Sequence, residues 1–132
     1  MRFGVSVAVL AAVLSFASIC LGKSLTMDET IDAINAETGC DRAMKPFKAC
    51  AYGSSGDIHL GAAVEKKCER DFLGRLKEPQ RRRYQSKMRL CDRKYPNEEG
   101  TMYRSFTAFC RAELARRFSR QAGSKAAPSS GH

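Results

Sequence analysis

Apolar residues recur at helical spacing through the middle of the chain. Between Ile58 and Lys77 they return at every fourth position, which is the spacing of one face of an α-helix. This stripe consists of Leu60, Val64, Cys68, Phe72 and Leu76. Glycine costs about 1 kcal/mol against alanine in a helix interior, so Gly61 and Gly74 are expected to weaken this helix without breaking it.

Two more helices are expected in the second half of the chain. Pro79 suits the first turn of a helix that runs to Tyr95, and we expect that helix to form an antiparallel hairpin with helix 58–77. Its apolar side consists of Tyr84, Met88, Cys91 and Tyr95. Thr101 is placed to cap the last helix, whose broad apolar face consists of Met102, Tyr103, Phe106, Phe109, Cys110, Leu114 and Phe118.

A shorter helix precedes these three. Thr26, with Glu29 three residues later, has the pattern of a capping box, and Gly39 is placed to end that helix. In the segment that follows, Pro46 is expected to limit helix continuity, and Asp57 is expected to cap helix 58–77. Because no segment alternates as a strand does, the sequence predicts an all-α fold, a small disulfide-stapled bundle of about four helices.

The chain begins with the layout of a secretory signal peptide. Arg2 is the positive flank, residues 5–21 are apolar, and cleavage after Gly22 would leave small residues at the two recognition positions, Cys20 and Gly22. The expected divisions are a signal peptide over 1–22, a helical cysteine-bridged domain over 23–120 and a disordered tail over 121–132. We therefore expect a secreted or periplasmic protein.

Two alternatives to cleavage after Gly22 are open. The apolar run could be an uncleaved membrane anchor, although it is slightly shorter than the ~20 residues that a spanning helix needs. Cys20 could instead be lipidated, as in a lipid-anchored envelope protein, although Ile19 before it is larger than such a site prefers. After cleavage, no later stretch is long and apolar enough to cross a bilayer.

Removal of residues 1–22 would leave five cysteines, which are the candidates for disulfide bonds. They are Cys40, Cys50, Cys68, Cys91 and Cys110. An exported chain meets an oxidising compartment, where disulfides are the default, and each typically adds ~2–4 kcal/mol to the stability of a small domain. Since five is odd, one cysteine is expected to stay free, to join two chains in a disulfide-linked dimer or to bind something else.

The sequence leaves the pairing of these cysteines open. Cys40 and Cys50 are close enough in sequence for a local bridge. In an antiparallel hairpin, Cys68 and Cys91 would lie at similar heights, since a helix rises 1.5 Å per residue. The competing scheme pairs Cys91 with Cys110 and leaves Cys68 as a buried, inert thiol.

The mature chain is strongly basic. Loss of Arg2 leaves 22 Lys and Arg against 14 Asp and Glu, a net charge of +8. Arg82, Arg89 and Arg93 are predicted on the side of their helix opposite Tyr84, where they are either solvated or bind an anionic envelope polymer or lipid surface. Nucleic acid is not expected as a partner, because export separates the protein from it and no base-stacking surface is evident.

The sequence contains none of the common catalytic motifs, such as GxSxG, HExxH or a phosphate-binding loop. His59 and His132 do not cluster with the cysteines, so neither a metal nor a cofactor is expected. The loop GSSGD before a helix could cradle an anion on its amides, although that pattern is more typical of a loop and cap. We therefore expect no catalytic residues and no enzymatic activity.

The order of cysteines and two motifs resemble a known family. After Cys40 and Cys50 come the basic helix PQRRRYQSKMRLC and the turn GTMYRSFTAFC, followed by RAEL. Over about residues 39–118 the chain resembles the lysozyme inhibitor LprI-like domain family of bacterial envelope proteins. The resemblance implies a small exported helical domain with cysteine bridges and a binding or structural role, with a lysozyme-type protein as one partner. Animal lysozymes are cationic, so a protein of charge +8 would need a local acidic patch such as DETIDAINAE.

Overall fold

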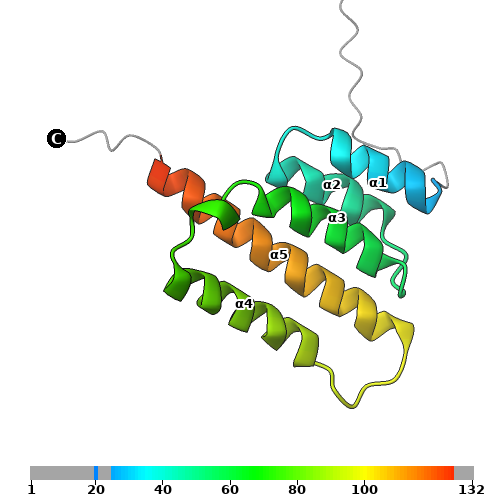
Figure 1. The fold of residues 1–132 in the computed structure, drawn as a ribbon. Helices are drawn as coiled ribbons and strands as arrows, with labels where there is room; N and C mark the ends of the chain where they lie inside the picture. Colours follow the sequence, from blue (N-terminus) through cyan, green and yellow to red (C-terminus); the bar gives the residue numbers. More distant parts are fainter. Residues whose placement is uncertain (1–19, 21–24, 127–132) are drawn as a thin grey trace, which may run out of the picture.

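The computed structural model describes Cys20 and residues 25–126, and these residues form a bundle of helices (Figure 1). The helices are α1 (Met27–Ala36), α2 (Cys40–Cys50), α3 (Asp57–Glu69), the short 3-10 helix η1 (Leu73–Arg75), α4 (Glu78–Arg93) and α5 (Thr101–Ala126). The predicted all-α, disulfide-stapled bundle is confirmed. The expected signal peptide lies outside the described residues except for Cys20. Helix α5 continues through 121–126, the first part of the expected disordered tail, and the rest of that tail lies outside the described residues.

Helices α3 and α5 lie side by side and run in the same direction. Ser105 donates a hydrogen bond of 2.6 Å to Asp57 at the start of α3. Ser119 donates one of 2.6 Å to Asp71, just after the end of α3. Both pairs are separated by 48 residues, so the two helices advance together and are parallel.

A row of small residues on α5 allows this close contact. The buried residues Ser105, Ala108, Ala112, Ala115 and Ser119 recur at steps of three and four along the helix. A Cβ atom built on Gly61 of α3 would lie 3.0 Å from the Cβ of Ala108 and 3.1 Å from its carbonyl oxygen. The absence of a side chain at Gly61 is therefore what lets the two backbones approach.

The predicted apolar face of the last helix was only partly right. Met102 and Phe106 are 49% and 42% exposed, because the small residues, rather than the bulkiest ones, face α3. Among the flanking residues, Phe109 stacks on Phe47 of α2 with ring centroids 4.3 Å apart. Phe118 packs on the α4 side, 4.9 Å from the ring of Tyr84.

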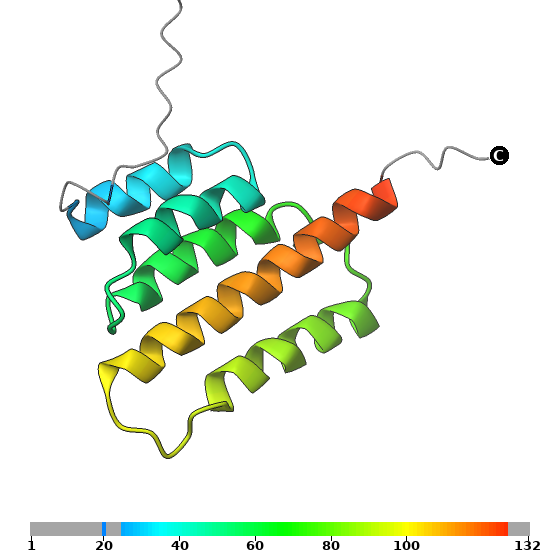
Figure 2. The same ribbon diagram turned by 180° about the vertical axis from the view of Figure 1, so that it is seen from behind.

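Helix α4 packs against α5, and α5 lies between α4 and α3 (Figures 1 and 2). The expected direct hairpin of helices 58–77 and 79–95 is therefore wrong. Helix α3 ends at Glu69, earlier than predicted, and the chain turns so that Phe72 is buried with its ring 5.0 Å from that of Tyr84. The place of Pro79 in the first turn of α4 is confirmed, although the helix begins at Glu78 and ends at Arg93, before the predicted Tyr95.

The N-terminal part of the bundle is built from α1 and α2. The capping box is confirmed: the Thr26 amide donates to Glu29, and the Glu29 amide donates to the Thr26 hydroxyl. Helix α2 is continuous through Pro46, contrary to the prediction. The ring removes one backbone donor, but the same helix buries Ala43, Met44 and Phe47, and that burial outweighs the loss.

Three disulfides join the elements, and the described residues contain no free cysteine. They are Cys20–Cys50, Cys40–Cys68 and Cys91–Cys110. The predicted alternative pair Cys91–Cys110 is confirmed, whereas Cys40–Cys50, Cys68–Cys91 and a free Cys68 are wrong. Cys40 and Cys50 begin and end one helix, about 15 Å apart, which is beyond the ~7 Å reach between Cα atoms in a disulfide. Because Cys20 has a partner, the described cysteines leave no odd thiol for a disulfide-linked dimer.

We expect Gly61→Ala to destabilise the oxidised protein by about 1 kcal/mol. Crowding against Ala108 costs about 1–3 kcal/mol, which exceeds the ~0.5–1 kcal/mol that alanine gains over glycine inside a helix. Urea unfolding measures the difference. Gly123→Ala in α5 is the control, because its Cβ would meet nothing within 4 Å, and we expect it to gain about 0.5 kcal/mol. A stabilising Gly61→Ala would contradict the close approach of α3 and α5.

Candidate functional site

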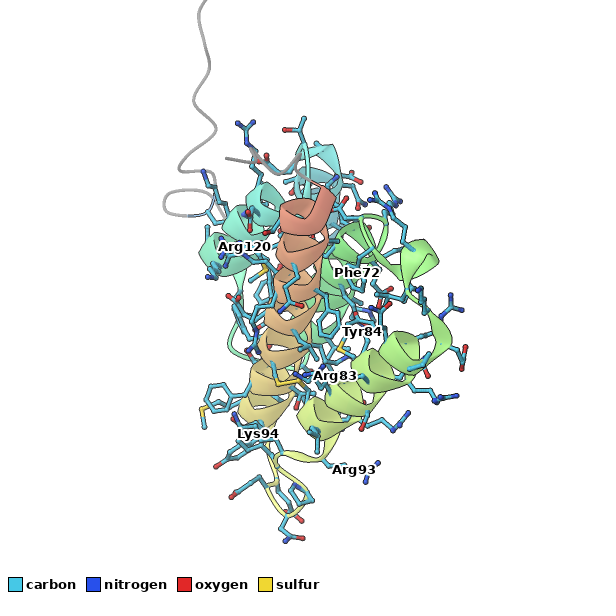
Figure 3. All side chains as sticks on the ribbon, turned by 90° about the vertical axis from the view of Figure 1, so that its left-hand side faces the viewer. Phe72, Arg83, Tyr84, Arg93, Lys94 and Arg120 are labelled. Carbon is cyan, nitrogen blue, oxygen red and sulfur yellow. A yellow bond between two sulfur atoms is a disulfide. The ribbon has the colours of Figure 1, made fainter. Side chains whose placement is uncertain are left out.

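The outer side of α4 carries a stripe of exposed cations, Arg82, Arg89 and Arg93, where the sequence placed them. Arg82 has one ion pair, with Glu78 one turn earlier, at a loose 3.7 Å between two well-exposed side chains. Arg89 and Arg93 make no ion pair with any described residue. Arg93 points away from the body of the protein (Figure 3). This stripe is therefore open to an external anion.

Asp92, near the C-terminal end of α4, does not neutralise the arginine stripe, because its carboxylate is bonded to Arg111 of α5. Arg111 donates from Nη1 to both carboxylate oxygens of Asp92 at 2.9 Å. It also donates from Nε and Nη2 to Glu65 of α3, at 3.0 and 2.7 Å. The bonds to Glu65, followed by those to Asp92, raise the pKa of the Arg111 guanidinium above its ordinary value. The arrangement clamps α3, α5 and α4 together.

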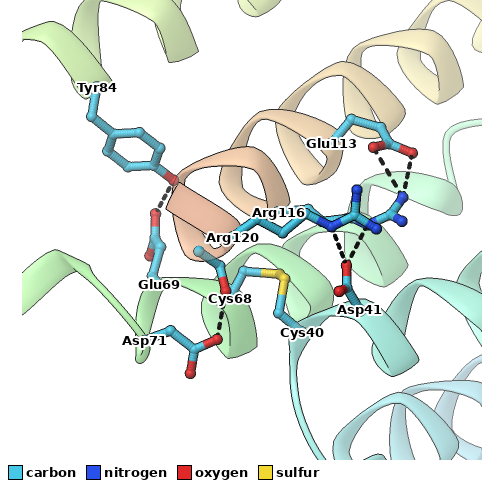
Figure 4. Close-up of a disulfide and its surroundings, with 10 residues drawn as sticks. Cys40, Asp41, Cys68, Glu69, Asp71, Tyr84, Glu113, Arg116 and Arg120 are labelled. Carbon is cyan, nitrogen blue, oxygen red and sulfur yellow. Dashed lines mark hydrogen bonds and ion pairs between the residues drawn. A yellow bond between two sulfur atoms is a disulfide. The ribbon is translucent and has the colours of Figure 1, made fainter. Parts of the chain in front are cut away.

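A second network of ion pairs joins acidic and basic side chains of α2 and α5 (Figure 4). Asp41 accepts hydrogen bonds from Arg116 at 2.7 Å and from Arg120 at 2.8 Å. The bond from Arg116 is the main reason why the pKa of Asp41 lies below its ordinary value. Glu113 pairs with Lys48 at 3.0 Å and, more weakly, with Arg116. Many acidic side chains of the bundle are thus occupied by basic residues of α2 and α5, and not by those of α4.

A groove of about 650 Å³ lies between α4, the turn before it and the end of α5. Phe72, Leu76 and Phe118 supply apolar surface inside it, and the basic residues Arg75, Arg83 and Lys87 line it as well. Figure 3 shows Phe72, Tyr84 and Arg83 in the space between α4 and α5. Because Arg83 and Lys87 belong to α4, positive charge extends from the exposed stripe around the helix to the groove.

An exposed leucine lies among these cations. Leu90 of α4 is 66% exposed, the highest value among the large apolar side chains on the described surface. Lys87 precedes it by three residues and Arg93 follows it by three, so both are its neighbours on the helix surface. Leu90 is therefore an exposed apolar side chain with a cation one turn away on either side.

The wall of the groove is held by a hydrogen bond between Tyr84 and Glu69. The Tyr84 hydroxyl donates to Glu69 at 2.8 Å, and the ring contacts both Phe72 and Phe118. Burial raises the pKa of Glu69, and the bond from Tyr84 offsets part of that effect. Burial, and then the nearby Glu69 carboxylate, raise the pKa of Tyr84.

The amide of Gly53, the first residue of the loop GSSGD, is not free to bind an external anion. The amides of Tyr52 and Gly53 donate to the carboxylate of Asp57 at 2.8 and 2.9 Å, so the protein's own anion occupies that place. Asp57 is buried and is the first residue of α3, with Gly56 as the N-cap, so its predicted capping role is wrong. Its side chain points back to the loop and to Ser105 instead.

The structure brings together features that lay apart in the sequence. Sequence reasoning placed the arginine stripe, but it missed the groove, Leu90 and the Tyr84–Glu69 bond. Arg83 and Lys87 are four residues apart, so the sequence could have placed them on the same face of the helix, the face that lines the groove. Nothing local indicates that Phe72 and Phe118 meet.

Within residues 25–126 and Cys20, no group of three or more His, Cys, Asp or Glu side chains is placed to hold a metal ion. None of the described helices is long and apolar enough to span a membrane.

No protein-family model matches the chain, no curated protein matches it in sequence, and no solved structure matches it. The interpretation of the site therefore depends on its own geometry.

We expect Tyr84→Phe to lower the free energy of unfolding by about 1–2 kcal/mol at pH 7, because Glu69 would lose a donor to its carboxylate. Ionisation of Glu69 costs stability as the pH rises above 4.5, its ordinary pKa, since the pKa is higher in the folded state. The effect of the substitution should therefore be smaller at pH 4. Urea unfolding at both pH values tests this. Tyr52→Phe, which removes a longer, exposed bond of 3.3 Å, should cost little. Equal losses for Tyr84→Phe at both pH values would contradict the role of Glu69 ionisation.

Proposed function

We propose that the protein is an exported, non-catalytic binding module that docks through α4 on an anionic phospholipid surface of the cell envelope. The observation that carries this proposal is the excess of basic side chains on α4, of which Arg89 and Arg93 make no ion pair with a described residue, beside the exposed Leu90 and a groove lined by both apolar and basic side chains. Its location outside the cytoplasm is supported by three disulfides, which are rare in reducing compartments.

The charge on α4 is sufficient to attract such a surface. Residues 78–93 include six basic and two acidic residues, and Arg111 holds one of those acids. Each Lys or Arg close to an anionic membrane contributes about 1 kcal/mol of attraction, which salt weakens. Three arginines on one stripe would therefore give about 3 kcal/mol, or on the order of 100-fold in affinity.

Apolar surface favours a lipid over a purely polar polymer. A polysaccharide or other soluble polyanion could pair with the arginines, but it would leave Leu90 in water. At a membrane surface, the leucine can enter the boundary between headgroups and acyl chains while the cations stay with the headgroups. The groove beside it combines aromatic side chains with Arg83 and Lys87 and suits part of a lipid in the same way.

Co-sedimentation with vesicles of phosphatidylglycerol and phosphatidylcholine tests the proposal. We expect the triple variant Arg82→Gln, Arg89→Gln, Arg93→Gln to lose on the order of 100-fold in binding, and wild-type binding to weaken as salt is added. The control is Arg42→Gln, Lys45→Gln, Lys66→Gln, which removes the same charge from exposed positions on α2 and α3 and should lose only a few-fold. Equal losses in the two triple variants would reject α4 as the docking face.

Leu90→Gln separates a lipid surface from a soluble polymer in the same experiment. Burial of a leucine is worth about 1.5–3 kcal/mol, so we expect about 10- to 100-fold weaker binding to vesicles. Binding to a soluble anionic polysaccharide should not change. Tight binding to the polymer with none to vesicles would refute the lipid surface and favour the envelope polymer.

Inhibition of a lysozyme is a second proposal, and one feature favours it. The exposed carboxylates Asp28 and Asp32 lie on α1, on the side of the bundle away from α4 (Figure 1). This acidic surface is the part of the protein that could face a cationic enzyme. Titration of a cationic lysozyme with the protein tests it, and we expect Asp28→Asn with Asp32→Asn to weaken any inhibition. No inhibition at large excess would remove this function.

A further inference from the structure

We infer that Cys20 remains in the exported protein and that the signal peptide is removed between Ala17 and Ser18. The inference rests on the export that is part of the proposed function, but not on the binding of lipid. It differs from the cleavage after Gly22 that the sequence first suggests, because that cut would discard Cys20.

The pairing of the cysteines requires Cys20 to be retained. Cys20 is bonded to Cys50 at the C-terminal end of α2, with Cα atoms 5.2 Å apart. The other four described cysteines pair with one another, so Cys50 has no alternative partner. A chain cut after Gly22 would leave Cys50 as an odd thiol, and a chain cut before Cys20 has three complete pairs.

Two further contacts lie at the same place in the fold. The Tyr52 hydroxyl donates to the carbonyl of Leu25, which lies just before α1. The Met27 side chain lies against Gly56, since a Cβ atom on that glycine would be 3.0 Å from Met27 Cε. Leu25 and Met27, at the start of α1, therefore lie against the loop that follows Cys50, and the disulfide joins Cys20 to the residue just before that loop.

The residues before Ser18 have the pattern of a complete signal peptide. An apolar core of 7–15 residues followed by small residues in an A-x-A-like pattern is typical. Cleavage after Ala17 gives a core of residues 5–14, with Ser15 and Ala17 at the recognition positions. Counted in the same way, cleavage after Gly22 would give a core of residues 5–19, at the upper limit of that range. The site before Ser18 thus satisfies both the pattern and the disulfide.

The chemistry of the two steps is ordinary. Cleavage adds one water across the Ala17–Ser18 peptide bond and leaves a carboxylate on Ala17 and an amino group on Ser18. Disulfide formation removes one proton and one electron from each of the Cys20 and Cys50 thiols. A disulfide-bearing thiol oxidoreductase of the envelope accepts them and is reduced to its dithiol. The same sulfur of Cys20 cannot also carry a thioether-linked lipid, so the disulfide and a lipid anchor exclude each other.

The test is to express the full chain in a bacterial host, recover it from the envelope fraction, and measure its intact mass. We expect Ser18 as the N-terminus. In denaturant, no thiol should react with iodoacetamide before reduction and six should react after it. A tryptic map should contain peptide 18–23 disulfide-linked to peptide 49–66.

Three other results would overturn the inference. The first is an N-terminus at Lys23, with Cys50 either as a reactive thiol or bonded to a second chain. The second is a diacylglyceryl thioether on Cys20. Both of these results would still be consistent with export of the protein. An uncut chain with six reduced thiols in the cytoplasm would overturn both the inference and export.

Matched variants locate the cut independently of the disulfide. Ala17→Leu places a bulky residue at the inferred recognition position, and we expect the unprocessed chain to accumulate. Gly22→Leu should be processed normally, with Ser18 still at the N-terminus. The reverse pattern would overturn the inferred site.

A further variant tests the disulfide. Cys20→Ser should expose one reactive thiol, that of Cys50, in the exported protein. If no new thiol became reactive in this variant, the pairing of Cys20 with Cys50 would be contradicted.

Discussion

The close, parallel contact of α3 and α5 is the constraint on which the rest of the bundle depends. Two helix backbones approach this closely only when the residues between them are small, and Gly61 facing Ala108 meets that condition. Once small residues of α5 face α3, its bulky residues must lie on the flanks. Phe109 then packs towards α2, and Phe118 packs towards α4. Helix α5 becomes the central rod, and α4 becomes an outer helix with one free side.

The hydrogen bonds along this contact fix its register as well as its direction. Ser105 donates to the buried carboxylate of Asp57, which would be costly to leave unmatched, and Ser119 donates to the exposed carboxylate of Asp71. A slip of one residue along α5 would break both bonds and would also move Arg111 away from Glu65 and Asp92. The position of α4 is therefore tied, through Arg111 and the Cys91–Cys110 disulfide, to the packing of α3 on α5.

The positive surface of α4 follows from this internal pairing and not from composition alone. The chain has 14 acidic residues, and many of them bond to groups within the bundle. Asp41, Glu65, Asp92 and Glu113 pair with cations of α2 and α5. The cations of α4 face outward, where few acids are available to them. The same salt bridges that hold the helices together therefore leave an excess of positive charge on one outer helix.

The sequence predicted features that depend on a single helix and missed those that depend on how helices meet. The Thr26 capping box, the place of Pro79 in the first turn of α4 and the inward side of α4 are local, and all three are confirmed. The buried face of α5 was misjudged because alanine and serine give a weak hydrophobic signal, although their steps of three and four were visible. The groove and the Arg111 clamp require two or three helices in fixed relation, which periodicity cannot supply. The disulfide of Cys20 was missed because the assumed cleavage site had already removed that residue.

The position of the N-terminal disulfide bears on how the protein could meet a membrane. Helices α1 and α2 lie on one side of α3 and α5, and α4 lies on the other (Figures 1 and 2). A lipid attached to Cys20 would hold the α1 side near the bilayer, and the arginines of α4 would then point away from it. A disulfide between Cys20 and Cys50 ties the same segment to the bundle and leaves α4 free to approach an anionic surface. Retention of Cys20 as a disulfide and docking through α4 are therefore compatible in orientation, whereas a lipid anchor at Cys20 and docking through α4 oppose each other.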